Sequence, residues 1–475
     1  MRRLFLSILL SAICIWNADC KSVKGTVKDE RGKGIAGVVV SDGLNTTVTK
    51  GGGRFKLEVD TDSRFIFIST PSGYISKTLK GQGCFFQELD QNTKSYNFVV
   101  TTNKQDDTNH NVIVIADPQI SERSELEELK EYAVDIEDYV IKSDGDYTFG
   151  LCLGDIVGWD HSIYPEYNKI MATTKIDFRS AIGNHDMTNY GRSHETSMAD
   201  YEKMFGPAWY SFNVGKVHYI VLNDNYYVGR DYFYIGLIDE RQLSWLERDL
   251  SYVPKGSKVV VAMHIPTTLD KADRDAFQYG IIGDNVSNKT ALYEMLEPYN
   301  TLILSGHMHT SDYEQISENI VEMNIAGLCG AWWCGSTCID GTPAGFKAID
   351  MNGDKMKWIY KGCGEPVEYQ FNAYADPAYP GYIVANVWDY DPEWKVEYFE
   401  DGKKTCDMEQ FTGKDMKARE LYKDPSSLKR NWVYAADTDH LFKAPMTKGA
   451  KKLEVKVTDR FGRTYTKTIH YAMPN

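Results

Sequence analysis

The stretch Val112-Ile-Val-Ile-Ala-Asp-Pro-Gln119 decides the fold of the central part of the chain. Its apolar half is continuous, as in a strand that is buried on both faces, and the polar residues Asp117 and Gln119 follow directly. Apolar runs of the same kind recur at 148–153, 178–182, 217–222, 258–262 and 301–305, with helical patterns between them. This alternation over about 220 residues predicts an α/β domain, whose sites usually lie beyond the carboxyl ends of the strands.

Polar residues with metal-binding side chains follow most of these strands. The second strand ends in Gly154-Asp155, the third in Gly183-Asn-His-Asp186, the fifth in His264 and the last in Gly306-His-Met-His309. One Asp or His at a strand end is more often a cap or a solvated turn residue, but so many at the same end of one sheet indicate a site. The glycines before Asp155, Asn184 and His307 let the backbone turn sharply, so that these side chains point inward.

The residue types in these blocks indicate chemistry with two metal ions. Carboxylate oxygens and imidazole nitrogens suit Mn, Fe, Zn or Ni, and one carboxylate can bridge two cations. Two metals about 3.5–4 Å apart can polarise a phosphoryl group, hold a hydroxide between them and stabilise the leaving oxygen. An imidazolium beside them, such as that of His185, can donate a proton or stabilise charge.

The series of blocks resembles the calcineurin-like metallophosphoesterase superfamily. The patterns Asp-x-Gln/His, Gly-Asp, Gly-Asn-His-Asp/Glu, a strand-end His and Gly-His-x-His occur here in family order. The resemblance implies an α/β (α+β) core of two mixed β-sheets packed between helices. It also implies hydrolysis of phosphomonoester or phosphodiester bonds by a metal-bound hydroxide, without a covalent protein intermediate. The flanking regions are similar to the β-rich N- and C-terminal domains of bacterial exported members.

The resemblance further implies a role for each residue of these blocks. Asp155 would be the carboxylate that bridges the two metals. The other ligands would be Asp117, Gln119 and His309 on the first metal, and Asn184, His264 and His307 on the second. His185 would act as the acid near the leaving-group oxygen, with Asp186 orienting its ring.

Gln119 departs from the commoner family pattern, which has histidine at this position. Its carbonyl oxygen is a weaker ligand than imidazole and favours an oxygen-preferring metal such as Mn. Gly158 stands where the purple-acid-phosphatase branch carries a metal-bound tyrosine, so the Fe(III) ligand of that branch is not expected. The predicted cofactors are two divalent metal ions, which are Mn, Fe or Zn.

Candidates for substrate binding lie close to these blocks in the sequence. They are His161, Arg192, His194, Trp332 and Trp333. Arg192 could bind a phosphate through its guanidinium fork, although an arginine in a polar loop is as often only solvated. The two tryptophans could stack on a base or a sugar, or could pack between domains. The same choice applies to Tyr226, Tyr227, Tyr232, Phe233 and Tyr234.

The regions on both sides of the central domain have the sequence pattern of β-sandwiches. Short strands with glycine turns fill residues 21–102, and strands return after residue 344 with a hairpin about Asn352-Gly353. The predicted organisation is a signal peptide at 1–20, an N-terminal β-sandwich domain at 21–102, the metallophosphoesterase domain at 108–343 and a C-terminal β-rich domain at 344–475.

The N-terminus is typical of an export signal. Arg2 and Arg3 precede the apolar run from Leu4 to Trp16, which is too short to span a bilayer comfortably. An uncleaved anchor or a buried first strand is the alternative. A lipoprotein cysteine at Cys20 is less favoured, because Asp19 precedes it. We therefore expect a secreted or periplasmic protein of bacterial type.

The charge balance restricts the partners. Lys and Arg number 53 against 67 Asp and Glu, which gives a net charge of −14. This acidity argues against a nucleic-acid polymer as substrate, because phosphate backbones are bound by clustered Lys and Arg. It permits a phosphorylated small molecule, glycan or lipid, since metal charges dominate locally. The sequence does not specify the oligomeric state.

The cysteines are compatible with an exported protein, because disulfides can form after export. Cys152 lies in an apolar run and is predicted to be a buried thiol. Cys329, Cys334 and Cys338 share one loop, where their spacing favours a local disulfide over a zinc site.

Two other functions are open on the sequence. A non-enzymatic binding protein with a degenerate central domain would need broken ligand blocks, but only Gln119 deviates. Another metal-dependent class, such as an amidohydrolase or metalloprotease, could use the same ligands. The chain has no His-Glu-x-x-His motif, which argues against a zinc protease.

Overall fold

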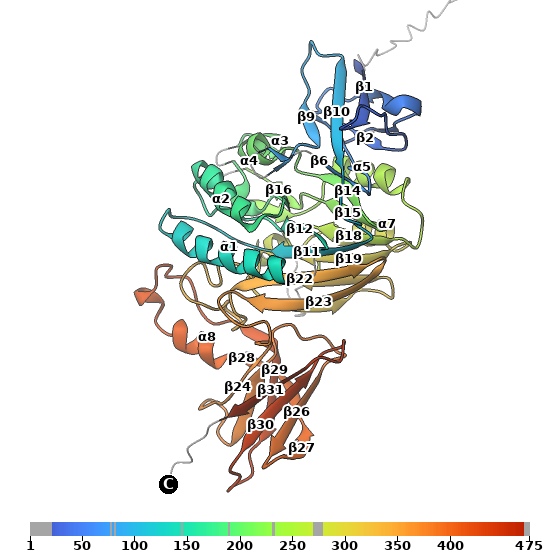
Figure 1. Ribbon diagram of the computed structural model, residues 1–475. Coiled ribbons are helices and arrows are strands. Elements are labelled where there is room, and N and C mark those ends of the chain that lie inside the picture. The colour runs from blue at the N-terminus through green and yellow to red at the C-terminus, as the bar shows by residue number, and fades with distance from the viewer. Residues whose placement is uncertain are drawn as a thin grey trace, which may run out of the picture.

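Three β-rich regions follow one another along the molecule in the computed structural model (Figure 1). The structure describes residues 21–76, 78–79, 82–143, 146–188, 191–229, 233–268 and 279–469. The predicted signal peptide at 1–20 and Tyr232 lie outside these residues. Among the helices that are described, none has the length and apolar character needed to cross a bilayer.

The N-terminal region consists of two four-stranded sheets in the orders β4-β1-β10-β6 and β3-β2-β5-β9. Their strands are β1 (Lys21–Asp29), β2 (Val39–Ser41), β3 (Thr46–Val48), β4 (Arg54–Val59), β5 (Phe65–Ile68), β6 (Tyr74–Ser76), β9 (Phe86–Glu88) and β10 (Ser95–Thr102), and a short pair β7 (Thr78–Leu79) and β8 (Gln82–Gly83) lies beside them. In β4, alternate residues Phe55, Leu57 and Val59 are buried, as in a sheet with one face on a core. The two sheets agree with the predicted β-sandwich.

The central region contains two mixed sheets, as the sequence predicts. The first has the order β13-β12-β11-β22-β23 and the second β14-β15-β18-β19-β21-β20. Their strands are β11 (Asn109–Ile115), β12 (Tyr147–Cys152), β13 (Phe178–Ser180), β14 (Tyr210–Val214), β15 (Val217–Val221), β18 (Lys258–Ala262), β19 (Asn300–Ser305), β20 (Asp312–Gln315), β21 (Ile320–Asn324), β22 (Gly345–Asn352) and β23 (Lys355–Gly362). A small hairpin, β16 (Asn225–Tyr227) and β17 (Tyr234–Gly236), lies near their ends. Strands β11 to β13 are mutually parallel, and so are β15, β18, β19 and β21, so their carboxyl ends lie at one edge of each sheet.

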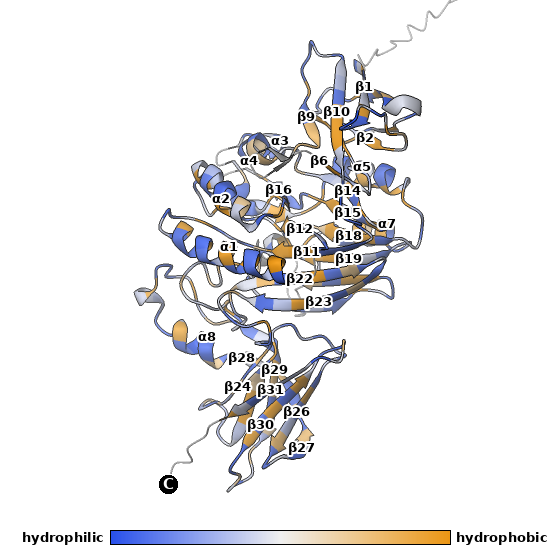
Figure 2. Ribbon diagram, viewed as in Figure 1, coloured by the Kyte–Doolittle hydropathy of each residue, from blue (hydrophilic) through white to orange (hydrophobic). Residues whose placement is uncertain are grey.

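Helices cover the central sheets. They are α1 (Glu125–Lys142), α2 (Tyr164–Met171), α3 (His194–Ser197), α4 (Ala199–Phe205), α5 (Glu240–Leu250), α6 (Tyr279–Asp284) and α7 (Lys289–Leu296). Short 3-10 turns lie at Gly51–Gly53, His161–Ile163, Ala172–Thr174, Asn184–Asp186 and Pro425–Ser427. Figure 2 shows both hydrophobic and hydrophilic residues along α1, and the helix buries Leu129, Ala133 and Ile136 at helical spacing.

Helix α1 begins at Glu125, directly after a turn. The Glu125 carboxylate accepts hydrogen bonds from the backbone N–H groups of Ser121 and Glu122, at 2.7 and 3.0 Å. These bonds fix the turn of residues 121–124 that leads from the site into the helix.

The hairpin about Asn352-Gly353 forms as predicted, but it belongs to the central sheet. Strand β22 pairs antiparallel with both β23 and β11. The sequence places the hairpin in the C-terminal β-rich domain that begins at residue 344, whereas in the structure its strands extend the central sheet. Its pairing partner β11 is more than two hundred residues away in the chain, so no local pattern reveals the pairing.

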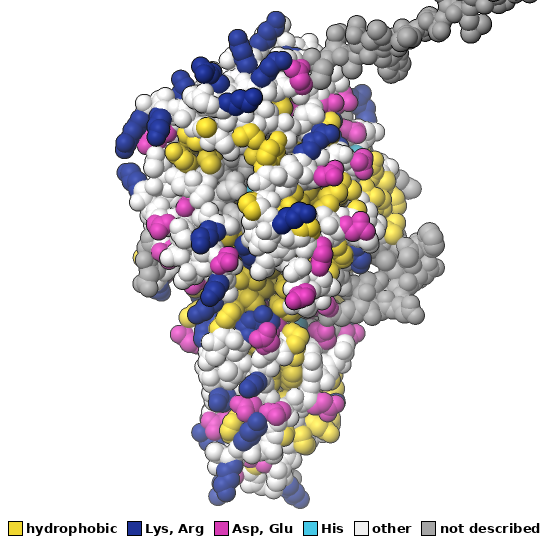
Figure 3. Space-filling view, turned by 90° about the vertical axis from the view of Figure 1, so that its right-hand side faces the viewer, with side chains coloured by type: hydrophobic (Ala, Val, Ile, Leu, Met, Phe, Trp, Pro, Cys, Tyr) yellow, Lys and Arg dark blue, Asp and Glu magenta, His cyan; other side chains and the backbone are white. Residues whose placement is uncertain are grey.

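The C-terminal region is a second sandwich of two four-stranded sheets, β24-β25-β29-β28 and β27-β26-β30-β31. Its elements are β24 (Asn372–Ala375), β25 (Tyr382–Asn386), β26 (Lys395–Glu400), β27 (Lys403–Asp407), β28 (Glu409–Lys414), α8 (Met416–Leu421), β29 (Asp437–Pro445), β30 (Leu453–Thr458) and β31 (Thr464–Ile469). Ile383, Tyr398 and Val455 lie in its own core. Figure 3 shows hydrophobic side chains at the waist where this sandwich meets the rest of the molecule.

The described cysteines are free thiols, so the expectation of a local disulfide in the loop after the last block is wrong. Each of the three thiols in this loop lies near a backbone carbonyl instead. Cys329, Cys334 and Cys338 face the carbonyl oxygens of Gly330, Trp332 and Gly327, at 3.6, 3.7 and 3.5 Å. Cys152 is buried, as predicted.

The buried histidine His110 makes the stability of this fold depend on pH. Its Nδ1 lies 2.9 Å from the carbonyl oxygen of Asp107, its Nε2 lies 2.6 Å from the hydroxyl of Tyr219, and burial lowers its pKa to about 4. In the unfolded chain this imidazole takes up a proton near pH 6.5, before the folded protein does. Its stabilising contribution is therefore present above pH 6.5 and is lost as the pH falls towards 4, at up to about 1.4 kcal/mol per pH unit. We expect the loss of stability between pH 7 and pH 5, measured by denaturant unfolding, to be smaller in His110→Gln; an equal loss in both proteins would contradict this.

Candidate metal centre

Five of the seven predicted metal ligands adopt left-handed backbone conformations. Their φ angles are 49° for Asp117, 39° for Gln119, 51° for Asp155, 73° for His307 and 53° for His309. Such conformations cost about 1–3 kcal/mol each and persist only where the surroundings enforce them, often at functional sites. They turn the chain sharply at each strand end and bring the side chains of separate strands together.

Glycines permit the closest approaches at this edge of the sheets. Gly154 has a φ of 95°, and a Cβ there would lie 2.8 Å from Nδ1 of His264. A Cβ on Gly183 would lie 2.2 Å from Oδ1 of Asp155. Both contacts are too short for any side chain, so only glycine lets these strand ends meet.

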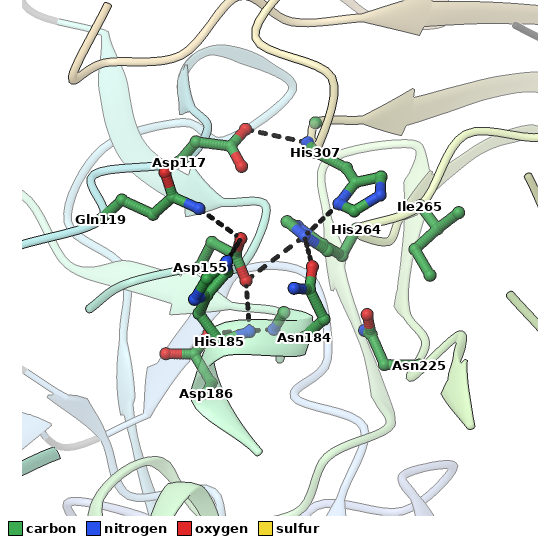
Figure 4. A network of polar contacts seen from close by, with 12 residues as sticks. Asp117, Gln119, Asp155, Asn184, His185, Asp186, Asn225, His264, Ile265 and His307 are labelled. Atoms are coloured by element: carbon green, nitrogen blue, oxygen red, sulfur yellow. Dashed lines mark hydrogen bonds and ion pairs between the residues drawn. The ribbon is translucent and has the colours of Figure 1, made fainter. Parts of the chain in front are cut away.

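Asp155 lies at the middle of the site (Figure 4). It is buried, and its Oδ1 accepts a hydrogen bond from the backbone N–H of His185 at 2.8 Å and lies 3.3 Å from Nε2 of His264. Its Oδ2 accepts a hydrogen bond from Nε2 of Gln119 at 2.8 Å. The two oxygens of one carboxylate thus face the two groups of predicted ligands.

One of these groups contains Asp155, His264 and His307. One ligand atom from each lies within 4.8 Å of the others. Nδ1 of His264 donates to the carbonyl oxygen of Leu153 at 2.8 Å, which turns Nε2 towards the site. That Nε2 lies 3.0 Å from Oδ1 of Asn184 and 3.2 Å from Nδ1 of His307. The structure therefore brings together all the residues predicted to bind the second metal.

Asp117 and His309 form the other group. Oδ1 of Asp117 lies 3.6 Å from Nε2 of His309, and both atoms are buried without a hydrogen-bond partner among the described residues. Nδ1 of His309 donates to the carbonyl oxygen of Gly330 at 2.7 Å, and burial lowers the pKa of this imidazole to about 4. A neutral imidazole with Nδ1–H donated is the form that offers Nε2 to a metal. Because buried polar atoms are nearly always paired, these two atoms fit a cation ligand set.

Gln119 is in the site but presents its nitrogen. Its Nε2 donates to Asp155, and its Oε1 lies 4.0 Å from Sγ of Cys329. The predicted ligand is the carbonyl oxygen, so in this structure Gln119 does not offer the expected atom. Rotation of the amide by half a turn would exchange the two atoms.

The electrostatics of the site also fit cations. Burial raises the pKa of Asp117 to about 8, of Asp224 to about 7 and of Asp186 to about 6. Burial alone would also raise the pKa of Asp155, but the imidazoles of His264 and His185 hold it well below its usual value. For His264, burial acts to lower the pKa, and the nearby carboxylates raise it to about 10. Several carboxyl groups are thus buried together, and bound cations would stabilise their ionised forms.

His185 lies at the mouth of the site with a fixed ring. Its Nδ1 donates to the carbonyl oxygen of Gly158 at 2.6 Å, and its Nε2 lies 3.9 Å from Oδ2 of Asp155. Asp186 is predicted to orient this ring, and its described hydrogen bonds are with other groups. Its carboxylate accepts hydrogen bonds from the backbone N–H groups of Gly183 and Ile156, and it stabilises the turn that carries the block.

The polar substrate-binding candidates make their described contacts with residues other than the predicted metal ligands. His161 contacts the carbonyl oxygen of His185 through Nε2 at 2.9 Å, so it supports the backbone of that residue. His194 pairs with Asp239 at 3.2 Å and lines a cavity of about 730 Å³ between the N-terminal and central regions, which the predicted metal ligands do not line. Arg192 is exposed, and its backbone N–H donates to Thr196. Helix α3 directs the ring of His194 towards Asp239, so this candidate lies in a different cavity from the predicted metal ligands.

The two tryptophans of the loop have different environments. The Trp332 ring stacks on His309, with centroids 4.0 Å apart and planes at 15°. Trp333 is buried, and its Nε1 donates to the carbonyl oxygen of Pro118 at 2.9 Å. Trp333 is therefore a packing residue, whereas Trp332 lies against a predicted ligand.

Among the other aromatic candidates, Tyr234 lies nearest to the site. Its ring is edge-on to that of His307, with centroids 6.1 Å apart. Tyr226 stacks on His194 in the cavity described above, and Phe233 is exposed.

Sequence reasoning missed two acidic residues of the site. Asp224 accepts hydrogen bonds from the backbone N–H groups of His264 and Ile265, at 3.3 and 2.8 Å. It follows the strand β15, so the strand-end pattern that identified the other blocks could have found it. Asp284 lies 3.5 Å from Nε2 of His307, and its place in α6 gives no such signal.

Several solved structures resemble this chain at low sequence identity. A dimetal phosphatase from Danio rerio is 15% identical, with a TM-score of 0.38, and the match covers 53% of this chain and 96% of that one. A purple acid phosphatase from yellow lupin seeds is 12% identical, with a TM-score of 0.41 and coverage of 70% and 68%. A 5'-nucleotidase from Candida albicans is 10% identical, with a TM-score of 0.33 and coverage of 54% and 51%. None of the curated proteins compared with the chain matches it.

Family models match nearly the whole described chain. The model of calcineurin-like phosphoesterase matches residues 110–311, which carry all the strand-end blocks. The models of the N-terminal and C-terminal regions of calcineurin-like phosphoesterase match residues 21–103 and 322–465. The chain therefore belongs to the calcineurin-like phosphoesterases, which are metal-dependent hydrolases of phosphoesters.

Proposed function

We propose that the chain is an exported dimetal phosphoesterase that hydrolyses phosphomonoester or phosphodiester bonds. The observation that carries this proposal is the position of Asp155, whose two carboxylate oxygens face two separate groups of buried ligand atoms. Export is supported by Arg2 and Arg3 before a short apolar run.

The ligand atoms divide between two cation sites that share Asp155. One site would be formed by Asp117, His309 and Gln119 after rotation of its amide. The other would be formed by Asn184, His264 and His307. Two bound divalent ions would supply Lewis acidity to the phosphoryl group and lower the pKa of a water molecule. Mn, Fe and Zn all suit this mixed oxygen and nitrogen set, and the oxygen of Gln119 favours Mn.

His185 is suited to protonate the leaving oxygen. Its Nδ1–H is held by the carbonyl oxygen of Gly158, so Nε2 is the atom that faces the site and can carry the transferred proton. Asp186, with its backbone hydrogen bonds, positions the turn that holds His185 rather than the ring itself.

A small phosphorylated compound is the proposed substrate class, whether a metabolite or part of a glycan or lipid. The net charge of −14 opposes binding of a nucleic-acid polymer, while bound cations would attract a single phosphate locally.

The test is hydrolysis of mono- and bis-p-nitrophenyl phosphate by metal-stripped protein with Mn, Zn, Fe or Mg restored singly. We expect turnover of at least one ester that depends on the added metal, with Mn among the most effective, and the ratio of the two rates distinguishes a monoesterase from a diesterase. Two bound equivalents of metal without turnover of either ester would contradict a broad phosphoesterase. A chain that binds no metal would favour a binding protein.

A further inference from the structure

A cavity of about 390 Å³ adjoins the candidate metal centre. Gln119 and His185 line it on the side of the metal ligands. Its other walls include Trp159 and Trp332 of the central region and Arg430 and Trp432 of the C-terminal region. The cavity is therefore completed by a part of the chain that follows the last metal-ligand block by more than a hundred residues.

The tryptophans of this cavity differ from the others that the structure describes. Trp159 and Trp432 are 49% and 50% exposed, and Trp332 is half-buried, whereas every other described tryptophan is buried. Indole rings bury a large apolar area and usually lie in cores or interfaces. Three rings that remain accessible around a single cavity indicate a ligand with apolar faces.

The segment that carries Trp432 is fixed in place. Arg430 pairs with Glu122 at 3.1 Å and with Glu125 at 2.9 Å, and its side chain is nearly buried. Val433 packs against Ala331 in a small core next to Trp332. These contacts attach the C-terminal segment to the start of α1 and to the loop of Trp332, so the cavity is preformed.

The same ion pairs determine what the cavity can bind. Glu122 and Glu125 pair with Lys429 as well as with Arg430, so two carboxylates balance two cations and leave no net positive charge for an anionic ligand. The remaining walls offer mainly indole faces. A flat, uncharged ring is the group that these walls complement.

The position of His185 relates the cavity to the reaction. Its ring is edge-on to Trp159, with centroids 4.5 Å apart, and its Nε2 faces Asp155. The leaving oxygen would lie beside Nε2, and the group attached to that oxygen would extend into the cavity. This step rests on the proposed function of His185 as the acid.

We propose that this cavity is the leaving-group subsite and that it selects phosphoesters of alcohols carrying a flat, uncharged ring. Trp432 is then a residue that determines specificity, and the C-terminal region forms part of the substrate site. Nucleosides, and glycosides or lipids that carry an aromatic ring, share this chemistry.

The test compares two esters of primary alcohols, benzyl phosphate and n-butyl phosphate, so that the leaving groups differ in shape and little in reactivity. With the metal-loaded protein, we expect Trp432→Ala to lower kcat/KM about tenfold for the benzyl ester and about twofold for the butyl ester. Trp432→Phe keeps an aromatic ring and is expected to lower kcat/KM about threefold or less for either ester. Tyr434→Ala is the matched control, because Tyr434 is 64% exposed on the same segment and does not line the cavity. Unfolding midpoints verify that each variant is folded.

A separate binding measurement distinguishes this inference from the proposed function. Benzylphosphonate and butylphosphonate cannot be hydrolysed at oxygen, and their Kd values are measured by calorimetry on the same proteins. Tighter binding of the benzyl compound that Trp432→Ala abolishes supports the subsite, even if no ester is turned over. The subsite would be overturned if Trp432→Ala weakened the benzyl and butyl compounds equally. It would also be overturned if Trp432→Ala changed neither kcat/KM for the esters nor Kd for the phosphonates. Absence of turnover with a preserved benzyl preference would count against the proposed reaction and not against the subsite.

Discussion

Asp155→Asn is expected to lower kcat/KM for the p-nitrophenyl esters by about a thousandfold and to reduce the bound metal below two equivalents. Asparagine keeps the shape of the side chain but removes the negative charge between the two ligand groups. Removing one partner from a buried charge cluster costs about 3–5 kcal/mol, and each 1.36 kcal/mol corresponds to tenfold. Elemental analysis of the purified variant and steady-state kinetics with metal in excess measure the two effects separately.

A buried carboxylate elsewhere provides the control. Asp249 is 2% exposed and accepts hydrogen bonds from Ser211 and His218, away from the metal ligands. Asp249→Asn is expected to lower stability but to keep metal content and turnover. A fully metallated Asp155→Asn with nearly wild-type turnover would contradict the assignment of the bridging ligand.

That the predicted metal ligands lie close together could be anticipated, because each follows the end of a strand. Buried parallel strands have a clear apolar signal, and topology brings their carboxyl ends to one edge of a sheet. Asp155, His264 and His307 therefore meet in the structure, although they are distant in the sequence. The two mixed sheets and the flanking sandwiches have similarly strong local patterns.

The orientation of individual side chains could not be predicted. The ring of His185 is fixed by the carbonyl oxygen of Gly158, and no sequence pattern specifies which backbone group will accept a given hydrogen bond. Closeness in sequence also does not show that the short helix α3 turns the side chain of His194 towards Asp239. Asp186 likewise follows His185 directly, yet it bonds to the backbone of its own turn and of Ile156.

Contacts between regions that are distant in the chain also could not be predicted from the sequence. The hairpin β22–β23 joins the central sheet through β11, and Trp432 reaches the central cavity from the C-terminal region. Both depend on how separately folded layers pack, and neither has a signal within a window of a few residues.

His185→Ala is expected to keep both metals and to lower kcat by about a hundredfold or more for esters of poor leaving groups. The backbone N–H of residue 185 donates to Oδ1 of Asp155, and alanine retains this bond, so the ligand geometry should survive. What disappears is Nε2, the atom proposed to carry the proton to the leaving oxygen. The loss should be large for benzyl phosphate and much smaller for p-nitrophenyl phosphate, because p-nitrophenolate leaves readily without a proton.

This dependence on the leaving group separates an acid from other roles of the same imidazole. Removal of a group that only binds the phosphate would slow the hydrolysis of both esters by the same factor. Removal of a metal ligand would lower the metal content of the protein, which elemental analysis detects. His194→Gln is the matched control, since it removes an imidazole from the cavity near Asp239 and should leave the ratio of the two rates as in the wild type. Equal losses for both esters, or loss of metal from His185→Ala, would therefore remove His185 from its proposed role as the acid, while leaving the metal ligands as assigned.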